Sequence, residues 1–251
     1  MFGLHLSSAG LAAVALIFVL AGLVKGVTGM GLPAVAMGLL GAFMPPVAAA
    51  ALLIIPATVT NVWQLFTGPD VAGVAARLKV MMLGIVMGTL AGSWLLTQAN
   101  SKWTTAGLGA ALAAYALYSL LAHPPAVPRR AERWLSPLVG LITGLVSGAT
   151  GVFSIPSVPY IQGMGLGKNE LIQALGLTFT VCTLALAAGL ALGGALHVEN
   201  ATASALAMVP AFAGMWLGTA IRGRIGADTF RRWFLIFLAV LGADLMARPL
   251  F

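Results

Sequence analysis

Two short segments of this chain carry the residue types that could hold an anion. They are Gly22–Gly29, with the sequence GLVKGVTG, and Gly144–Gly151, with the sequence GLVSGATG, and six of their eight positions are identical. Their side chains that can donate hydrogen bonds are Lys25, Thr28, Ser147 and Thr150. Ammonium and hydroxyl groups of this kind suit a small oxyanion. Because the matches keep one register in two halves of the chain, we interpret the segments as an internal duplication.

Both segments predict a break in a helix. Glycines cluster there close to a proline, and they are Gly26, Gly29 and Gly31 before Pro33, and Gly148 and Gly151 before Pro156. Such clusters favour unwound backbone, which is tolerated at membrane depth only where protein or water satisfies it. Paired interruptions in two halves indicate a transport site, and free N–H groups at the following short helices would favour an anion. The alternative interpretation is a pair of packing kinks.

Lys25 has two interpretations that depend on its depth. If the break lies inside the hydrocarbon, the charge is costly and would pair with an anion. If the first span crosses fully, the side chain would instead extend to the cytoplasmic surface. Both interpretations stay open on the sequence alone.

A second polar cluster follows in each half, inside a long apolar run. It reads PATVTN at Pro56–Asn61 and GLTFT at Gly176–Thr180. Threonine hydroxyls can bond to the preceding helical turn, so packing competes with ligand binding there. Asn61 is harder to explain by packing, because a buried amide needs several partners. The predicted substrate-binding residues are Lys25, Gly26, Thr28, Gly29, Asn61, Ser147, Gly148, Thr150, Gly151, Ser154 and Thr178.

The composition requires a membrane. Of 251 residues 60% are hydrophobic and only 8% are charged, against about 25% charged in soluble domains. The apolar runs are continuous, which predicts helices rather than a barrel. The net charge of +7 does not indicate nucleic-acid binding, because the basic residues sit in short gaps between apolar runs. We expect residues 1–24 to be a retained span rather than a signal peptide.

The runs divide the chain into two halves of five elements each. Residues 1–122 form the first predicted repeat, 123–133 a polar cytoplasmic linker, and 134–251 the second repeat. The predicted runs are 8–24, 32–43, 47–66, 80–96 and 104–122, then 134–147, 152–163, 171–192, 201–221 and 233–245. The gap 67–79 is expected to be a loop. The first two elements of each half would form a broken helix or a re-entrant hairpin. A duplication with an odd number of crossings has inverted topology.

Positive charge agrees with that topology. If the two elements around each break enter the membrane and come back, ten of the twelve basic residues lie on one side; this count leaves out Lys25, which sits at the break. If instead the short runs 32–43 and 152–163 do not cross the membrane, the same twelve residues divide equally between its two sides. Since basic residues favour the cytoplasm, we expect the linker inside and both termini outside. Tryptophans would then lie near span ends, and these are Trp94, Trp103, Trp134 and Trp233.

Other chemistry has little support in the sequence. His5, His123 and His197 have no metal-ligand spacing, Cys182 stands alone, and no acid–base pair is recognisable. We therefore expect no enzyme, no metal and no cofactor, and no ATP-binding GxxxxGK[ST] loop occurs. Asp244 could couple protons, although a position at the interface beside Arg248 is the simpler explanation. The series Gly84, Gly88 and Gly92 indicates a packing face.

These features resemble the sulfite exporter TauE/SafE family of membrane proteins. The resemblance rests on Gly22–Pro33, its second copy Gly144–Pro156, and Gly214–Ile225 followed by Phe230-Arg-Arg. It covers nearly the whole chain. Phe153 and Ser154 stand where the pattern has more glycine. The resemblance implies export or uptake of small anions, including sulfite and organosulfonates.

The sequence thus predicts an all-α polytopic membrane protein of a bacterial-type cytoplasmic membrane, built from two inverted repeats. We expect a secondary transporter for a small sulfur-containing or carboxylate anion, working by alternating access. A passive anion channel is the alternative, because no clear coupling carboxylate is visible. The expected partners are the anion and the lipid bilayer. A coupling ion, proton or sodium, and a homo-oligomer stay open.

Overall fold

The computed structural model describes residues 8–122, 126–196, 198–224 and 226–248, and side chains within these ranges except those of residues 8, 198–200 and 227–228. In these ranges the chain forms ten α-helices and no strand, as expected. The helices are α1 (Ser8–Thr28), α2 (Leu32–Gly41), α3 (Pro46–Phe66), α4 (Val71–Gln98), α5 (Ser101–Leu121), α6 (Arg129–Thr150), α7 (Ser157–Gly163), α8 (Lys168–Leu192), α9 (Val198–Ile221) and α10 (Ala227–Ala247).

The helices and their surface are those of an integral membrane protein. Six of them, α1, α3, α4, α5, α8 and α9, are long and apolar enough to cross a bilayer. All six tryptophans are at least 66% exposed, which is normal where the surrounding solvent is lipid. Residues Trp94, Trp103, Trp134 and Trp233 belong to this exposed set, together with Trp63 and Trp216.

Both predicted breaks are present and have the same local geometry. Thr28 ends α1 and Thr150 ends α6, and Gly29 and Gly151, the next residues, have positive φ angles of 79° and 72°. The Thr28 hydroxyl donates to the Val24 carbonyl (2.8 Å) and accepts from the Met30 amide (3.2 Å). The Thr150 hydroxyl makes the same two bonds with residues 146 and 152, at 2.7 and 3.2 Å. Threonine therefore closes each helix, and glycine turns the chain away.

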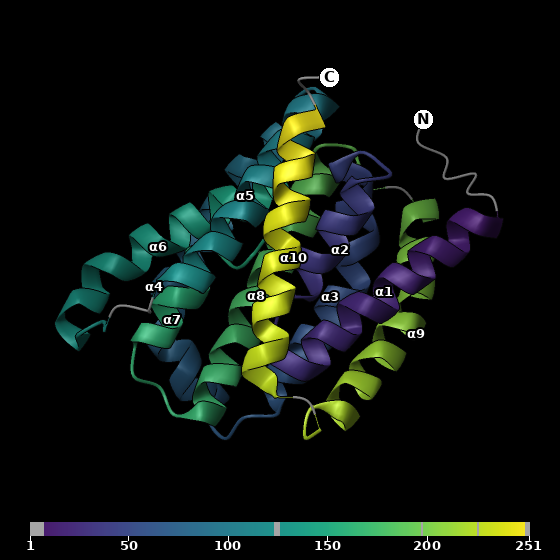
Figure 1. Cartoon of the computed structure of the whole chain (residues 1–251). Helices are drawn as coiled ribbons and strands as arrows, with labels where there is room; N and C mark the ends of the chain where they lie inside the picture. Colours follow the sequence, from purple (N-terminus) through teal and green to yellow (C-terminus); the bar gives the residue numbers. More distant parts are fainter. Residues whose placement is uncertain (1–7, 123–125, 197, 225, 249–251) are drawn as a thin grey trace.

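Two helix pairs with glycine-lined contacts flank the molecule. α4 packs along α6, and α1 packs along α9, which Figure 1 shows as neighbouring purple and yellow-green helices. A Cβ at Gly88 would lie 2.3 Å from a carbonyl of α6, and a Cβ at Gly218 would lie 2.2 Å from a carbonyl of α1. Glycine permits this close backbone approach. The predicted packing face at Gly84, Gly88 and Gly92 is confirmed.

The helix pairing repeats between the halves. α4 with α6 corresponds to α9 with α1, and α4 with α8 corresponds to α9 with α3. The central helices α3 and α8 pack on each other, as do α5 and α10. This pattern agrees with a duplication around a twofold relation. The orientation of the halves across the membrane stays a prediction.

Several boundaries differ from those predicted. α4 begins at Val71 inside the expected 67–79 loop, because Asp70 caps it by accepting from the Gly73 amide (2.8 Å). α6 begins at Arg129, so the second part of the expected linker is helical, and residues 123–125 lie outside the described ranges. α7 starts only at Ser157, after Pro156. α10 starts at Ala227, six residues before Trp233. Amphipathic and charged helix ends were mistaken for loops.

Candidate functional site

Lys25 is buried in the protein interior. It lies in the last turn of α1 and is 4% exposed. Its Nζ donates to Thr60 Oγ1 (3.1 Å) and to Asn61 Oδ1, both on α3. The snorkelling interpretation is therefore wrong for this structure. A lysine side chain is held here by two neutral polar groups.

The α3 segment that receives Lys25 is shaped by Pro56. Proline has no N–H, so the Leu52 carbonyl loses its helical donor. Ser204 of α9 replaces it: its hydroxyl donates to Leu52 O (2.8 Å) and accepts from Ile55 N (3.1 Å). The Thr60 hydroxyl donates to Pro56 O (2.7 Å), which leaves its oxygen lone pairs facing Lys25. The interrupted helix thus positions Thr60 and Asn61.

Three buried polar atoms on α3 have no hydrogen-bond partner among the described residues. They are Thr58 Oγ1, Asn61 Nδ2 and Gln64 Oε1. The three-residue spacing places them along one helix face. Asn61 is fully buried, and Gln64 is 7% exposed. Since buried polar groups in proteins nearly always have partners, this face indicates a place for a polar ligand or water beside Lys25.

Two glutamines join the end of α3 to the start of α8 by hydrogen bonds. Gln64 Nε2 donates to Ile172 O (3.1 Å), and Gln173 Nε2 donates to Leu65 O (2.9 Å). Gln173 Oε1 also accepts from Asp70 N (3.1 Å). Asn61 precedes the last residue of α3 by five positions, about 7 Å along a helix. The Lys25 contact therefore lies about one and a half turns inside this end of α3.

The equivalent position in the second half is neutral. Ser147 occupies the place of Lys25, and its hydroxyl lies 3.0 Å from Thr89 Oγ1 of α4 and 3.0 Å from Gly144 O. The buried Cys182 thiol of α8 lies beside it. Residue 181, which corresponds to Asn61, is valine. At these equivalent positions, the first half alone therefore has a charged side chain, Lys25, and a side-chain amide, Asn61.

The two breaks approach each other through intervening side chains. A Cβ at Gly151 would lie 2.9 Å from Met37 of α2. The Tyr115 hydroxyl donates to Met30 Sδ (3.6 Å) and lies beside Ser154. The first break is partly exposed at residues 28–30, whereas residues 150–154 at the second break are buried. The two breaks therefore differ in solvent exposure.

Seven of the eleven predicted site residues fall into three groups, and the other four, Gly29, Ser147, Gly151 and Ser154, are described above. Lys25 and Asn61 are in direct contact. Thr28 and Thr150 close their helices, and Thr178 donates to Ala174 O (2.8 Å) on its own helix. Gly26 and Gly148 face the backbones of α9 and α4, and a Cβ added at either glycine would lie 2.3 Å from a carbonyl oxygen of that helix. The structure does not bring all eleven predicted residues together. Their roles in substrate binding stay predictions.

Reasoning from sequence omitted Thr60, Gln64 and Ser204 from the site. Thr60 stands beside Asn61 in a cluster that was recognised. Ser204 could have been found only by asking which side chain replaces the donor that Pro56 removes. Within the described ranges, no cluster of three or more His, Cys, Asp or Glu could hold a metal.

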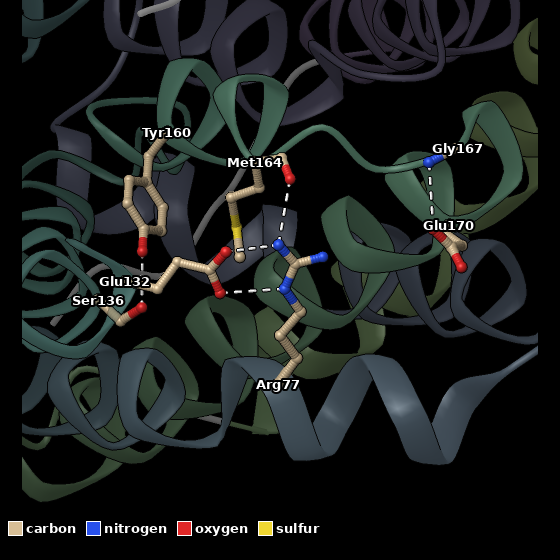
Figure 2. A network of polar contacts seen from close by, with 7 residues as sticks. All are labelled: Arg77, Glu132, Ser136, Tyr160, Met164, Gly167 and Glu170. Atoms are coloured by element: carbon tan, nitrogen blue, oxygen red, sulfur yellow. Dashed lines mark hydrogen bonds and ion pairs between the residues drawn. The ribbon is translucent and has the colours of Figure 1, made fainter. Parts of the chain in front are cut away.

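A separate polar network ties the α7–α8 turn to α4 and α6 (Figure 2). Arg77 donates to both carboxylate oxygens of Glu132, at 3.0 and 2.5 Å, and to Met164 O at 3.1 Å. The Tyr160 and Ser136 hydroxyls share a bond of 2.7 Å nearby. A cavity of about 250 Å³ beside Arg77 carries acids as well as bases among its lining residues. This mixed charge does not favour an anion, so the network is structural.

Comparison with protein families agrees with this arrangement. The family model described as "Sulfite exporter TauE/SafE" matches residues 14–245. The chain belongs to the TauE/SafE family. The TauE/SafE match includes both breaks, Lys25 and the whole α3 face, and TauE/SafE proteins are membrane transporters. No curated protein and no solved structure matches this TauE/SafE chain.

Proposed function

We propose that this protein is a secondary transporter for a small oxyanion such as sulfite or an organosulfonate, which binds between Lys25 and Asn61. The observation that carries the proposal is the burial of Lys25 among neutral partners, next to an Asn61 amide nitrogen that has no hydrogen-bond partner in the described part of the chain. Both described ion pairs in the chain lie elsewhere, at Arg77–Glu132 and Arg248–Asp244.

The physical argument concerns charge. Burying an ammonium group without a counter-charge is costly. An oxyanion would supply that charge and accept from Lys25 Nζ and Asn61 Nδ2 together. Hydrogen bonds between ionised partners are about twice as strong as neutral ones. A site of this composition therefore favours anions over neutral solutes of similar size.

The duplicated architecture supports alternating access. Repeats that exchange their packing can open a site to either side in turn. The first break is half-buried and the second is fully buried, which suits a form with access from one side. In our proposal the membrane is a cytoplasmic one, residues 126–133 face the cytoplasm, and both termini lie outside.

The experiment is uptake of labelled sulfite by proteoliposomes. Uptake should saturate, and unlabelled sulfite loaded inside should accelerate it, because a carrier exchanges substrate across its two states. A passive channel would show no such acceleration. Lys25→Met should reduce the rate at least about tenfold, as expected when a charge-assisted hydrogen bond is lost. Lys102→Met is the matched control, since Lys102 is exposed. Uptake no faster than in empty liposomes would refute transport of this anion.

A further inference from the structure

We propose that Lys25 also carries the proton of the transport cycle, so that the anion moves together with a proton. This rests on the proposed function, because it assigns the coupling ion to the same site. The free amine would gain a proton from the aqueous side when the anion binds, forming one N–H bond. It would return that proton to water on the other side when the anion leaves.

Among the described side chains around Lys25, none carries a negative charge that could take the place of the anion. On α3 its partners are the neutral Thr60 and Asn61. On α1 it is the sole ionisable side chain between residues 9 and 28, and α2 has none. α9 contributes only Glu199, at its opposite end, and that side chain is not described.

The ionisable groups of α10, which also packs on α1, are mostly cationic or paired. Arg231 and Arg232 are exposed, and Asp244 is bound to Arg248 (2.8 Å). Asp228 belongs to the side chains that the structure does not describe. Arg222, after α9, is exposed as well. Positive neighbours disfavour a second positive charge but attract an anion.

The protonation of Lys25 and the binding of the anion must therefore favour each other. Without an anion, the neutral amine still donates two hydrogen bonds to the Thr60 and Asn61 oxygens. With an anion, the ammonium form has its counter-charge. Linkage is reciprocal, so anion binding raises proton affinity by the same factor by which protonation raises anion affinity. Lowering the pH should strengthen anion binding.

No other described side chain within the bundle offers a comparable proton site. Asp244, the acid considered from the sequence, has a side chain that is 54% exposed and paired with Arg248. Its position fits an interfacial ion pair. Tyr115 lies against Met30 and Cys182 lies beside Ser147, whereas the hydrogen-bond partners of Lys25 are Thr60 and Asn61.

The test uses proteoliposomes with the membrane potential clamped at zero. Labelled methanesulfonate is the probe, with sulfite in parallel, because a sulfonate stays fully ionised throughout the neutral range. With the outside more acidic by one pH unit, coupling of a proton to each anion predicts about tenfold accumulation inside. A pH-sensitive dye in the lumen should report acidification during uptake.

The outcomes separate the two proposals. Uptake that stops at equal concentrations, with no acidification of the lumen, overturns proton coupling and leaves transport standing. Uptake of neither anion overturns both. Lys25→Arg is the diagnostic variant, because a guanidinium group stays protonated. It should abolish accumulation and acidification together. If Lys25→Arg melts normally and still accumulates the anion, Lys25 is not the proton carrier.

Discussion

Lys25 on α1 donates to the side-chain oxygen of Asn61 on α3, and the Asn61 amide nitrogen has no partner among the residues that the structure describes. This pairing joins the first break to the α3 segment that Pro56 and Ser204 shape. The Asn61 amide nitrogen can therefore donate a hydrogen bond to an anion that binds beside Lys25.

Replacing Asn61 with aspartate should prevent the anion from binding without unfolding the protein. The new carboxylate would form a permanent ion pair with Lys25 and take the place of the anion. We expect sulfite uptake to fall at least about tenfold while the melting temperature holds or rises. Asn100→Asp is the control, because Asn100 is an exposed helix cap and aspartate caps equally well. Normal uptake by Asn61→Asp would remove Asn61 from the site.

Ser204→Ala should destabilise the protein. The change leaves the Leu52 carbonyl and the Ile55 amide without their partner at the Pro56 interruption. Unsatisfied buried groups cost about 1–3 kcal/mol, which thermal or chemical unfolding in detergent would register. Ser101→Ala removes an exposed hydroxyl and should change little. Equal stability of the two variants would mean that α3 does not depend on Ser204.

Arg77 and Glu132 should show a measurable coupling energy. Their side chains are 22% and 13% exposed, and Arg77 also donates to the Met164 carbonyl. A double-mutant cycle with Arg77→Met and Glu132→Gln should give about 1–3 kcal/mol in the free energy of unfolding. Strictly additive losses would show that the two side chains act independently.

The topology predicts opposite positions for the linker and the carboxyl terminus. A reporter that is active only in the cytoplasm should function when inserted at Ala126 and fail after Phe251. The expectation follows from the ten basic residues on one side. Activity at both positions would contradict the inverted arrangement of the repeats.

The sequence predicted the local features well. The breaks at Gly29 and Gly151 depend on glycine, threonine and proline within a few residues, so they could be recognised directly. The Asp70 cap was overlooked because Arg77 and Lys79 made the first turns of α4 resemble a loop. Charged residues at the end of a membrane helix do not separate helix from loop.

Long-range pairings could not be predicted in the same way. Lys25 and Asn61 are 36 positions apart, and Ser204 lies 152 positions from Leu52. The glycine patterns predict close helix contacts but do not say which helices meet. For the same reason Gly26 and Gly148, which looked like members of the binding site, face neighbouring helix backbones.

The most direct test of an anion site at Lys25 is equilibrium binding of labelled sulfite to the purified protein. Wild-type protein should bind saturably, and Lys25→Met should raise the Kd about ten- to hundredfold, the effect of losing a hydrogen bond to a charged group. Lys25→Met also takes the donor from the buried Asn61 Oδ1, so both Kd values are measured well below the melting temperature of each protein. An unchanged Kd in Lys25→Met would contradict the assignment of the site to Lys25.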